Sequence, residues 1–203
     1  MKHLAILISN GGTGTNLQAI IDAIESKKIN AKISVVVSDR EDAPGLNRAK
    51  KHKLQTEINF DKKKLLSILK KYNVDYIALA GWKQIVTNEV MREYKNKILN
   101  VHPGLIPNTM DGKVKTPDGS LGLWNKGKYT VKAIKNFFDN HATYAGCTVH
   151  FLTNEFDFGP VLGRGFVKIN SHDTIDSLYD QVKEKEHELY ITALQKLCEK
   201  KQS

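Results

Sequence analysis

Residues 4–25 read LAILISNGGTGTNLQAIIDAIE, and this stretch indicates the fold more directly than any other. Residues 4–8 form a short β-rich apolar run, and a glycine-rich turn follows at once. From residue 17 on, apolar residues recur at the spacing of an amphipathic helix. A strand, a glycine turn and a helix in this order form the first half of a βαβ unit, so the segment predicts a parallel sheet.

The same alternation continues through the first half of the chain. We expect strands at residues 4–8, 33–37, 55–58, 76–80 and 98–101, with helices at 16–25, 45–52, 62–72 and 88–94. Strands at 148–152 and 161–169 and a helix at about 174–197 complete the pattern. This predicts an α/β fold with a doubly wound, mostly parallel sheet of Rossmann-like type, whose ligands bind beyond the carboxyl ends of the strands.

The length of 203 residues suits one domain. Between Pro103 and Gly146 the alternation is lost, and turn signals recur before a helix near residues 131–138. We therefore expect a single domain, residues 1–203, with an irregular insertion at about residues 106–130.

The composition, with 40% hydrophobic and 26% charged residues, is typical of a globular protein rather than of a disordered or membrane protein. The apolar run at residues 4–8 is too short for a secretory signal. No stretch approaches the roughly 20 apolar residues that would span a bilayer. We expect a cytoplasmic protein without a membrane partner.

The charge and the cysteines exclude further classes. A net charge of +9 favours anionic ligands, but the lysines are not interleaved with base-stacking aromatics, so a solvated surface is favoured over nucleic-acid binding. Cys147 and Cys198 lie far apart without metal-ligand spacing, which indicates two reduced packing residues and no metal site.

The turn at residues 9–16 presents free backbone N–H groups and the positive end of a helix dipole, which suits a phosphate. Thr15 or Asn16 could cap the helix. No Lys-Ser/Thr pair follows, and Leu17 stands where a dinucleotide-binding turn has its third glycine, so ATP and NAD are disfavoured. The alternative is an ordinary strand–helix turn.

Asn100 and His102 end another strand, just before Pro103. Strand alternation puts both side chains on one face. An amide can stabilise the oxyanion that forms when an amine attacks a formyl or acyl carbon, and an imidazole can move the protons. The alternative is two polar side chains that are satisfied at a strand end.

Two further loops follow predicted strands. Asp157 precedes Gly159-Pro160 in an acidic loop, where its carboxylate could orient His102 or simply form a turn. The run from Ala80 to Val86, with Trp82 inside it, could line a slot for a flat heterocycle or form a plain core corner.

Together these motifs resemble the folate-dependent glycinamide ribonucleotide transformylases of purine synthesis, over most of the chain. The most specific segments are Asn16-Leu17-Gln18-Ala19-Ile20, Ala80-Gly81-Trp82, Asn100-Val101-His102-Pro103-Gly104-Leu105-Ile106-Pro107, Val149-His150-Phe151, Asp157-Phe158-Gly159-Pro160-Val161 and Glu186-His187. The Asn-x-His-Pro motif and the following Asp belong to the wider formyltransferase superfamily, so the first loop and last helix indicate the acceptor.

The resemblance implies 10-formyltetrahydrofolate as co-substrate, a phosphorylated amine as acceptor, and no metal. Asn100 would hold the formyl oxygen, His102 would act as acid and base, and Asp157 would pair with His102 and relay protons through water. The substrate phosphate would contact Gly14, Thr15, Asn16, Lys183 and Glu186. The folate would contact Lys63, Lys83, Gln84, Ile85, Val86, Asn100, Thr153, Asn154, Glu155, Phe156 and Asp157, with Lys63 at its tail.

The chain departs from the family pattern in two places. Its glycine loop, around Gly11 and Gly12, is two residues longer, and the segment between His102 and His150 is also longer. Three other functions stay open: transfer to another amine such as an amino sugar nucleotide, hydrolysis of formyltetrahydrofolate, and a non-catalytic nucleotide-phosphate binding module. The sequence allows a monomer or a homodimer.

Overall fold

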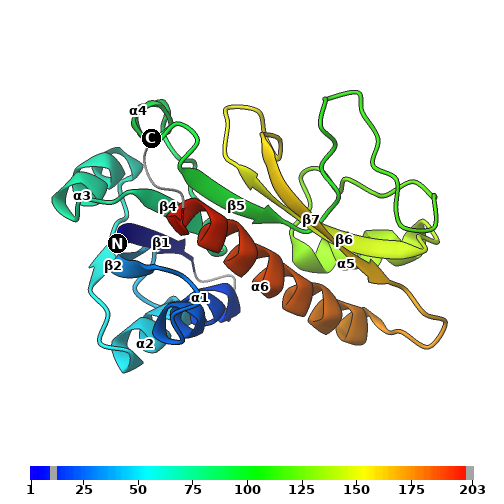
Figure 1. Cartoon of the computed structure of the whole chain (residues 1–203), viewed down its shortest axis with the longest axis horizontal. Helices are drawn as coiled ribbons and strands as arrows, with labels where there is room; N and C mark the ends of the chain where they lie inside the picture. The colour runs from blue at the N-terminus through cyan, green and yellow to red at the C-terminus, as the bar shows by residue number, and fades with distance from the viewer. Residues whose placement is uncertain (10–12, 200–203) are drawn as a thin grey trace. The chain divides into compact units, whose positions relative to one another are not determined.

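The computed structural model describes residues 1–9 and 13–199, and within them seven strands form one sheet. Its strand order is β3-β2-β1-β4-β5-β6-β7. The pairs among β1 to β5 are parallel, and β6 and β7 are antiparallel. The predicted α/β fold with a mostly parallel sheet is therefore confirmed (Figure 1). The strands are β1 (Lys2–Ile8), β2 (Ala31–Ser38), β3 (Thr56–Ile58), β4 (Tyr76–Leu79), β5 (Ile98–His102), β6 (Tyr144–Phe151) and β7 (Val161–Lys168).

The helices lie where the apolar spacing predicts them. They are α1 (Thr15–Glu25), α2 (Pro44–Lys51), α3 (Leu65–Lys71), α4 (Asn88–Glu93), α5 (Thr130–Asp139) and α6 (Ile175–Glu199). A short 3₁₀ helix, η1 (Lys62–Lys64), precedes α3, and the side chain of Asp61 accepts a hydrogen bond from the Lys63 N–H at its start. The sequence pattern had merged these two elements into one helix.

Two local predictions are wrong. Neither Thr15 nor Asn16 caps α1, because the helix begins at Thr15 and its N-cap is Gly14, which has a left-handed backbone and no side chain that could accept a hydrogen bond from the first turn. Strand β6 begins at Tyr144, four residues before the expected start at residue 148. Gly146, taken as the end of the segment without alternation, lies inside this strand and makes room for Leu105, whose Cδ2 would lie 2.5 Å from an added Cβ.

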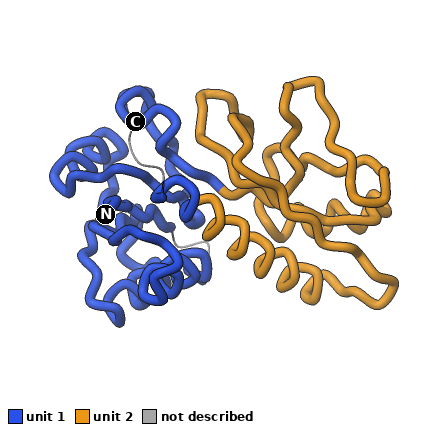
Figure 2. Tube along the Cα trace, viewed as in Figure 1, with its two compact units in different colours: residues 1–100, 194–203 blue, residues 101–193 orange. Residues whose placement is uncertain are grey.

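The chain's contacts divide it into two compact units (Figure 2). The first contains Met1–Asn100 and the chain from Leu194 on, and the second contains Val101–Ala193. The prediction of a single domain is not tested by this division and stays a prediction.

In the first unit, strand β1 is apolar from Leu4 to Ile8 because parallel strands are covered on both faces. Residues 4–8 are at most 1% exposed. Helices α1 and α2 pack against each other and against β2, while α3 packs against α4 (Figure 1). The sequence predicts ligand-binding loops after β1 and β4, beyond the carboxyl ends of these parallel strands.

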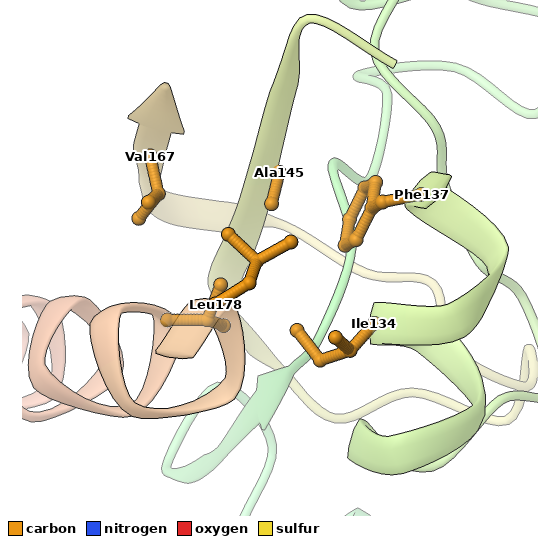
Figure 3. Close-up of a cluster of buried hydrophobic side chains, with 6 residues drawn as sticks. Ile134, Phe137, Ala145, Val167 and Leu178 are labelled. Atoms are coloured by element: carbon orange, nitrogen blue, oxygen red, sulfur yellow. The ribbon is translucent and has the colours of Figure 1, made fainter. Parts of the chain in front are cut away.

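The second unit has its own core between helices α5 and α6 and strands β6 and β7 (Figure 3). The cluster contains Ile134 and Phe137 from α5, Ala145 from β6, Val167 from β7, and Leu178 and Val182 from α6. These side chains bury the apolar face of each element. Burial of apolar surface is the largest favourable contribution to the free energy of folding.

The predicted insertion is irregular, and the described bridge within it joins Lys115 to Leu121. Its start is fastened to the β6–β7 hairpin. The hydroxyl of Thr148 donates to the Gly104 carbonyl and accepts from the Ile106 N–H, and Arg164 donates to the Ile106 carbonyl. These hydrogen bonds satisfy backbone groups that would otherwise be buried without partners.

Both cysteines are free and buried, as expected for packing residues. Burial raises the pKa of the Cys198 thiol to about 11 and raises that of Cys147 further. Among the helices of the described residues, none has the length and apolar character needed to cross a bilayer.

We expect Phe137→Ala to lower the free energy of unfolding by about 3–5 kcal/mol, because the fully buried ring would leave a cavity in the core of the second unit. Urea denaturation followed by circular dichroism measures this change. Lys135→Ala, on the exposed side of the same helix, should stay within about 0.5 kcal/mol of the wild type. A loss below about 1 kcal/mol for Phe137→Ala would contradict this description of the core.

Candidate active site at the end of strand β5

The second unit brings His102 and Asp157 together. His102 is the last residue of β5 and is only 2% exposed. Its Nδ1 lies 3.5 Å from Oδ1 of Asp157, in the loop between β6 and β7. Asp157 has a left-handed backbone with φ of 48°, a conformation that aspartate tolerates better than most residues. The backbone turn at this position directs the carboxylate toward the imidazole.

Two residues of the insertion also contact this pair. The carbonyl oxygen of Trp124 accepts a hydrogen bond from His102 Nε2 at 2.8 Å, and the indole N–H of Trp124 donates to the Asp157 carbonyl oxygen at 2.9 Å. The N–H of Gly127 donates to Asp157 Oδ2 at 2.7 Å. Neither residue is predicted from the sequence, because a lone tryptophan or glycine in a turn-rich segment carries no motif.

Gly104 allows the Trp124 backbone to come this close. A Cβ at position 104 would lie 1.9 Å from the Trp124 carbonyl oxygen, which no side chain tolerates. The Leu105 N–H donates to the Leu123 carbonyl, and the Asn125 side chain donates to the Pro103 carbonyl. The glycine after His102-Pro103 is therefore a steric requirement of the site.

The electrostatics favour a charged Asp157. Burial alone would raise the pKa of this carboxyl, but the hydrogen bond and charge of His102 and the Gly127 N–H outweigh burial and lower it. Asp157 is therefore a carboxylate at neutral pH.

A second histidine, His150, is fully buried near the pair and stays neutral. Burial lowers its pKa to about 4, and nearby His102 acts in the same direction. Its Nδ1 hydrogen-bonds the Phe151 carbonyl at 3.0 Å, so Nδ1 carries the hydrogen. His150 is thus held as a neutral residue of the site wall.

Asn100 is half-buried in β5, two residues before His102, so the strand pleat puts both side chains on one face as predicted. Asn100 belongs to the first unit and His102 to the second. Its contact with a formyl oxygen stays a prediction.

The predicted phosphate loop lies in the first unit. Gly14 has φ of 74° and lies close to α2, where an added Cβ would meet the Gly45 Cα at 2.9 Å. Thr15 and Asn16 form the first turn of α1, and the Asn16 side chain is buried. Gly11 and Gly12 lie outside the described residues. Phosphate binding by this loop stays a prediction.

Arg48 was not found by the sequence analysis, although it reaches this loop. Its Nε–H donates to the Thr13 carbonyl oxygen at 3.0 Å, and its Nη1 donates to the Gln18 side chain. Helical spacing places Arg48 on α2, but nothing in the sequence indicates which way it points. The structure adds a cation beside the start of α1.

Lys183 and Glu186 form an ion pair one turn apart on α6. Glu186 is 2% exposed, so its carboxylate depends on this lysine for neutralisation. The structure thus brings these two predicted residues together. Their predicted partners, Gly14 to Asn16, belong to the other unit, and a shared phosphate site stays a prediction.

The predicted folate contacts also divide between the units. In the first unit, Lys63 is exposed on η1, the Lys83 N–H donates to Ser9 Oγ at 3.0 Å, and the Gln84 side chain donates to the carbonyls of Asn59 and Phe60. Ile85 is 74% exposed, whereas Val86 is buried. The exposed apolar side chain is free to contact a ligand.

In the second unit, the loop after β6 is closed by Thr153, whose hydroxyl donates to the Phe158 carbonyl at 2.7 Å. Asn154 and Glu155 are exposed, and Phe156 is 69% exposed. An exposed aromatic ring beside Asp157 suits a flat heterocycle. The roles of these residues in folate binding stay predictions.

Within residues 1–9 and 13–199, no three His, Cys, Asp or Glu side chains are grouped so as to hold a metal ion. In the second unit, His102 and Asp157 bring a buried imidazole and a carboxylate together, which are groups for proton transfer.

The chain belongs to the formyl transferase family, whose family model matches residues 2–194. It is 35% identical to the phosphoribosylglycinamide formyltransferase of Haemophilus influenzae over 199 residues, which cover 94% of this chain and 84% of that protein. The enzyme of the same name from Dictyostelium discoideum is 31% identical over 98% of both chains.

A solved structure, glycinamide ribonucleotide transformylase 1 from Symbiobacterium toebii, matches with a TM-score of 0.82 and 31% identity, over 98% of this chain and 88% of that chain. The chain spans 66% of the length of the chloroplast phosphoribosylglycinamide formyltransferase of Arabidopsis thaliana and 18% of the human trifunctional purine biosynthetic protein adenosine-3.

We expect Asp157→Asn to lower the free energy of unfolding at neutral pH by about 1–3 kcal/mol, because it weakens the charge-assisted hydrogen bond from the Gly127 N–H and removes the negative charge that faces His102. The folded pKa of Asp157 lies below its ordinary value of 3.8, so this stabilisation is present above that pH and is lost as the pH falls through the folded pKa. The difference between variant and wild type should therefore close in acid.

Urea unfolding at a series of pH values from 7 to 3 measures this difference. Asp139→Asn, at the exposed end of α5, is the matched control. A difference that stays constant, or grows, as the pH falls would contradict the ionised state assigned to Asp157.

Proposed function

We propose that this chain transfers the formyl group of 10-formyltetrahydrofolate to the amine of 5'-phosphoribosylglycinamide, a step of purine biosynthesis and one-carbon metabolism. The observation that carries the proposal is the buried His102 with Asp157 at 3.5 Å from its Nδ1, at the carboxyl end of β5 and two residues after Asn100. Binding alone does not require an amide, an imidazole and a carboxylate at one strand end.

In the reaction, the amine nitrogen attacks the formyl carbon and a tetrahedral oxyanion forms. The amide of Asn100 donates a hydrogen bond to the oxyanion, as an oxyanion-hole group does. The bond from the formyl carbon to the folate nitrogen then breaks. One proton leaves the attacking amine and one proton reaches the folate nitrogen, so the balance is neutral.

His102 and Asp157 divide these proton transfers. Asp157 is ionised, and it accepts the amine proton through water. The imidazole of His102, whose Nδ1 faces that carboxylate, takes up this proton and passes it to the leaving nitrogen, so both groups return to their starting state. His150 keeps its neutral form and takes no part in the transfer.

The choice of acceptor is supported by the relatives of 31% and 35% identity, whose names specify phosphoribosylglycinamide. Gly14, Thr15 and Asn16 at the start of α1 bind its phosphate in this proposal, with Lys183 and Glu186 from α6. Lys63, the run from Lys83 to Val86, and the loop from Thr153 to Asp157 bind the folate. Arg48 adds positive charge near the phosphate loop.

The three alternative functions differ from this proposal in what the protein would form: another formylated amine, free formate, or no product at all. A formyltetrahydrofolate deformylase from Pseudomonas syringae matches with a TM-score of 0.78 but at 17% identity, and this likeness concerns the fold alone. We infer that the protein works in the cytoplasm as a monomer or homodimer, without a nucleic-acid partner. The positive charge of the chain then serves its anionic small-molecule ligands.

We expect the purified protein to form a formylated product only when both 10-formyltetrahydrofolate and phosphoribosylglycinamide are present. Reactions with folate alone and with other amines, including an amino sugar nucleotide, are run beside it. Release of formate in the absence of an amine would show that the protein hydrolyses formyltetrahydrofolate and does not transfer the formyl group. A formylated product that forms only with another amine would show that this amine, and not phosphoribosylglycinamide, is the acceptor. Ligand binding without any turnover would show that the protein is a non-catalytic binding module.

We expect Asn100→Ala and His102→Gln each to lower kcat by roughly 10²-fold or more, because they remove the oxyanion donor and the proton-transfer group. Steady-state kinetics measures the loss, and Lys135→Ala provides the control on the exposed side of α5. Wild-type kcat in both variants would reject these roles even if the protein transfers formyl groups.

A further inference from the structure

We propose that Trp124, in the insertion, is a positioning residue that fixes the orientation and proton placement of the His102–Asp157 pair, with Gly127 as its second anchor. The proposal rests on the proposed function, since it concerns the same catalytic pair. It extends the site to a segment that no family motif of this sequence includes.

The Trp124 carbonyl decides which nitrogen of His102 carries hydrogen. A carbonyl oxygen only accepts hydrogen bonds, so Nε2, at 2.8 Å, is the donor. The neutral ring therefore has its lone pair on Nδ1, which faces Asp157. When the ring takes up a second proton, Nδ1–H points at the carboxylate. Trp124 thus keeps Nδ1 opposite Asp157.

The insertion also holds Asp157 at both ends of the residue. The indole N–H of Trp124 bonds its backbone carbonyl, and the Gly127 N–H bonds its Oδ2. Oδ1 is the oxygen that faces His102 Nδ1. These two bonds stabilise the left-handed backbone of Asp157. Without them, the residue would lower its free energy by moving to a more common backbone conformation.

The segment that carries Trp124 is itself anchored on several sides. Leu123 and Asn125 bond the backbone of the loop after His102, and Asn136 from α5 donates to the Asn125 side chain at 2.7 Å. The Trp124 ring contacts the Phe158 ring at a centroid distance of 5.7 Å. Because the segment is fixed in this way, the Trp124 carbonyl and indole N–H hold defined positions against His102 and Asp157.

A packing role alone would explain the ring contact but not the two polar bonds to the catalytic pair. The titratable groups that face His102 are Asp157 and His150, and the ammonium of Lys126 lies 5.0 Å from the centre of the Trp124 ring. Any change of pH dependence in a Trp124 variant should therefore come through Asp157 or His150, since Lys126 contacts the Trp124 ring and not the pair.

The test compares the full-length wild type with Trp124→Phe, which removes the indole N–H and keeps the ring and the backbone carbonyl. The loss of one neutral hydrogen bond should lower kcat by roughly 3- to 10-fold. KM for both substrates should stay within about 2-fold, because Trp124 orients the pair and does not bind substrate. The acid limb of the kcat–pH profile should move, because Asp157 is held less firmly opposite Nδ1.

A second variant, Gly127→Ala, keeps the test decisive if Trp124→Phe does not fold. The glycine has φ of 76°, and an added Cβ would meet only the Phe156 ring at 3.9 Å, so alanine strains the backbone without a clash. It should tilt the N–H away from Asp157 Oδ2 and lower kcat in the same way. Lys126→Met, which removes the cation over the same ring, is the matched control and should keep wild-type kinetics.

A readout independent of turnover separates this proposal from the proposed function. Nitrogen-15 NMR of the histidine rings should show Nε2 of His102 protonated in the neutral wild type, and its titration should change in Trp124→Phe and Gly127→Ala. Unchanged ring signals and unchanged kcat in both variants would overturn the positioning role. A rise in KM at constant kcat would also overturn it, because Trp124 would then be a binding contact. An inactive wild type with these NMR changes would instead reject formyl transfer alone.

Discussion

A buried imidazole must find a partner for each ring nitrogen, and this requirement organises the second half of the chain. At His102 the partners come from two segments that are far apart in sequence, the Trp124 carbonyl at 2.8 Å and the Asp157 carboxylate at 3.5 Å. The left-handed turn at Asp157, the missing side chain at Gly104 and the fastening of the insertion all serve this single arrangement. Strand β5 of the sheet positions His102, and the loops that carry Trp124 and Asp157 supply its partners.

Electrostatics then gives two neighbouring histidines different properties. His150 is fully buried, and its pKa falls to about 4, so it stays neutral. His102 is almost as buried, but its two ring nitrogens face the Trp124 carbonyl and the Asp157 carboxylate. Its carboxylate partner keeps its charge because two hydrogen-bond donors outweigh the cost of burial. The same strand-end environment can thus hold one imidazole inert and prepare another for proton transfer.

The regular part of the structure was predictable from sequence, and the insertion was not. Periodicity located the strands because buried parallel strands, such as residues 4–8, are continuously apolar. Two alternating positions sufficed to put Asn100 and His102 on one face. Trp124 and Arg48 escaped prediction because their bonds involve backbone carbonyls, which every residue offers. The start of β6 was also missed, because the sequence does not show that Gly146 lies within a strand to make room for Leu105.

The way in which the insertion is attached has a consequence for how this fold can diversify. Its beginning is clamped by Thr148 and Arg164, and its end by contacts from Leu123 to Gly127. None of the described hydrogen bonds of residues 108–121 reaches His102 or Asp157. Loop length there is decoupled from the geometry of the reactive pair, so this stretch can be lengthened, shortened or replaced by another sequence while the chemistry beneath it is kept.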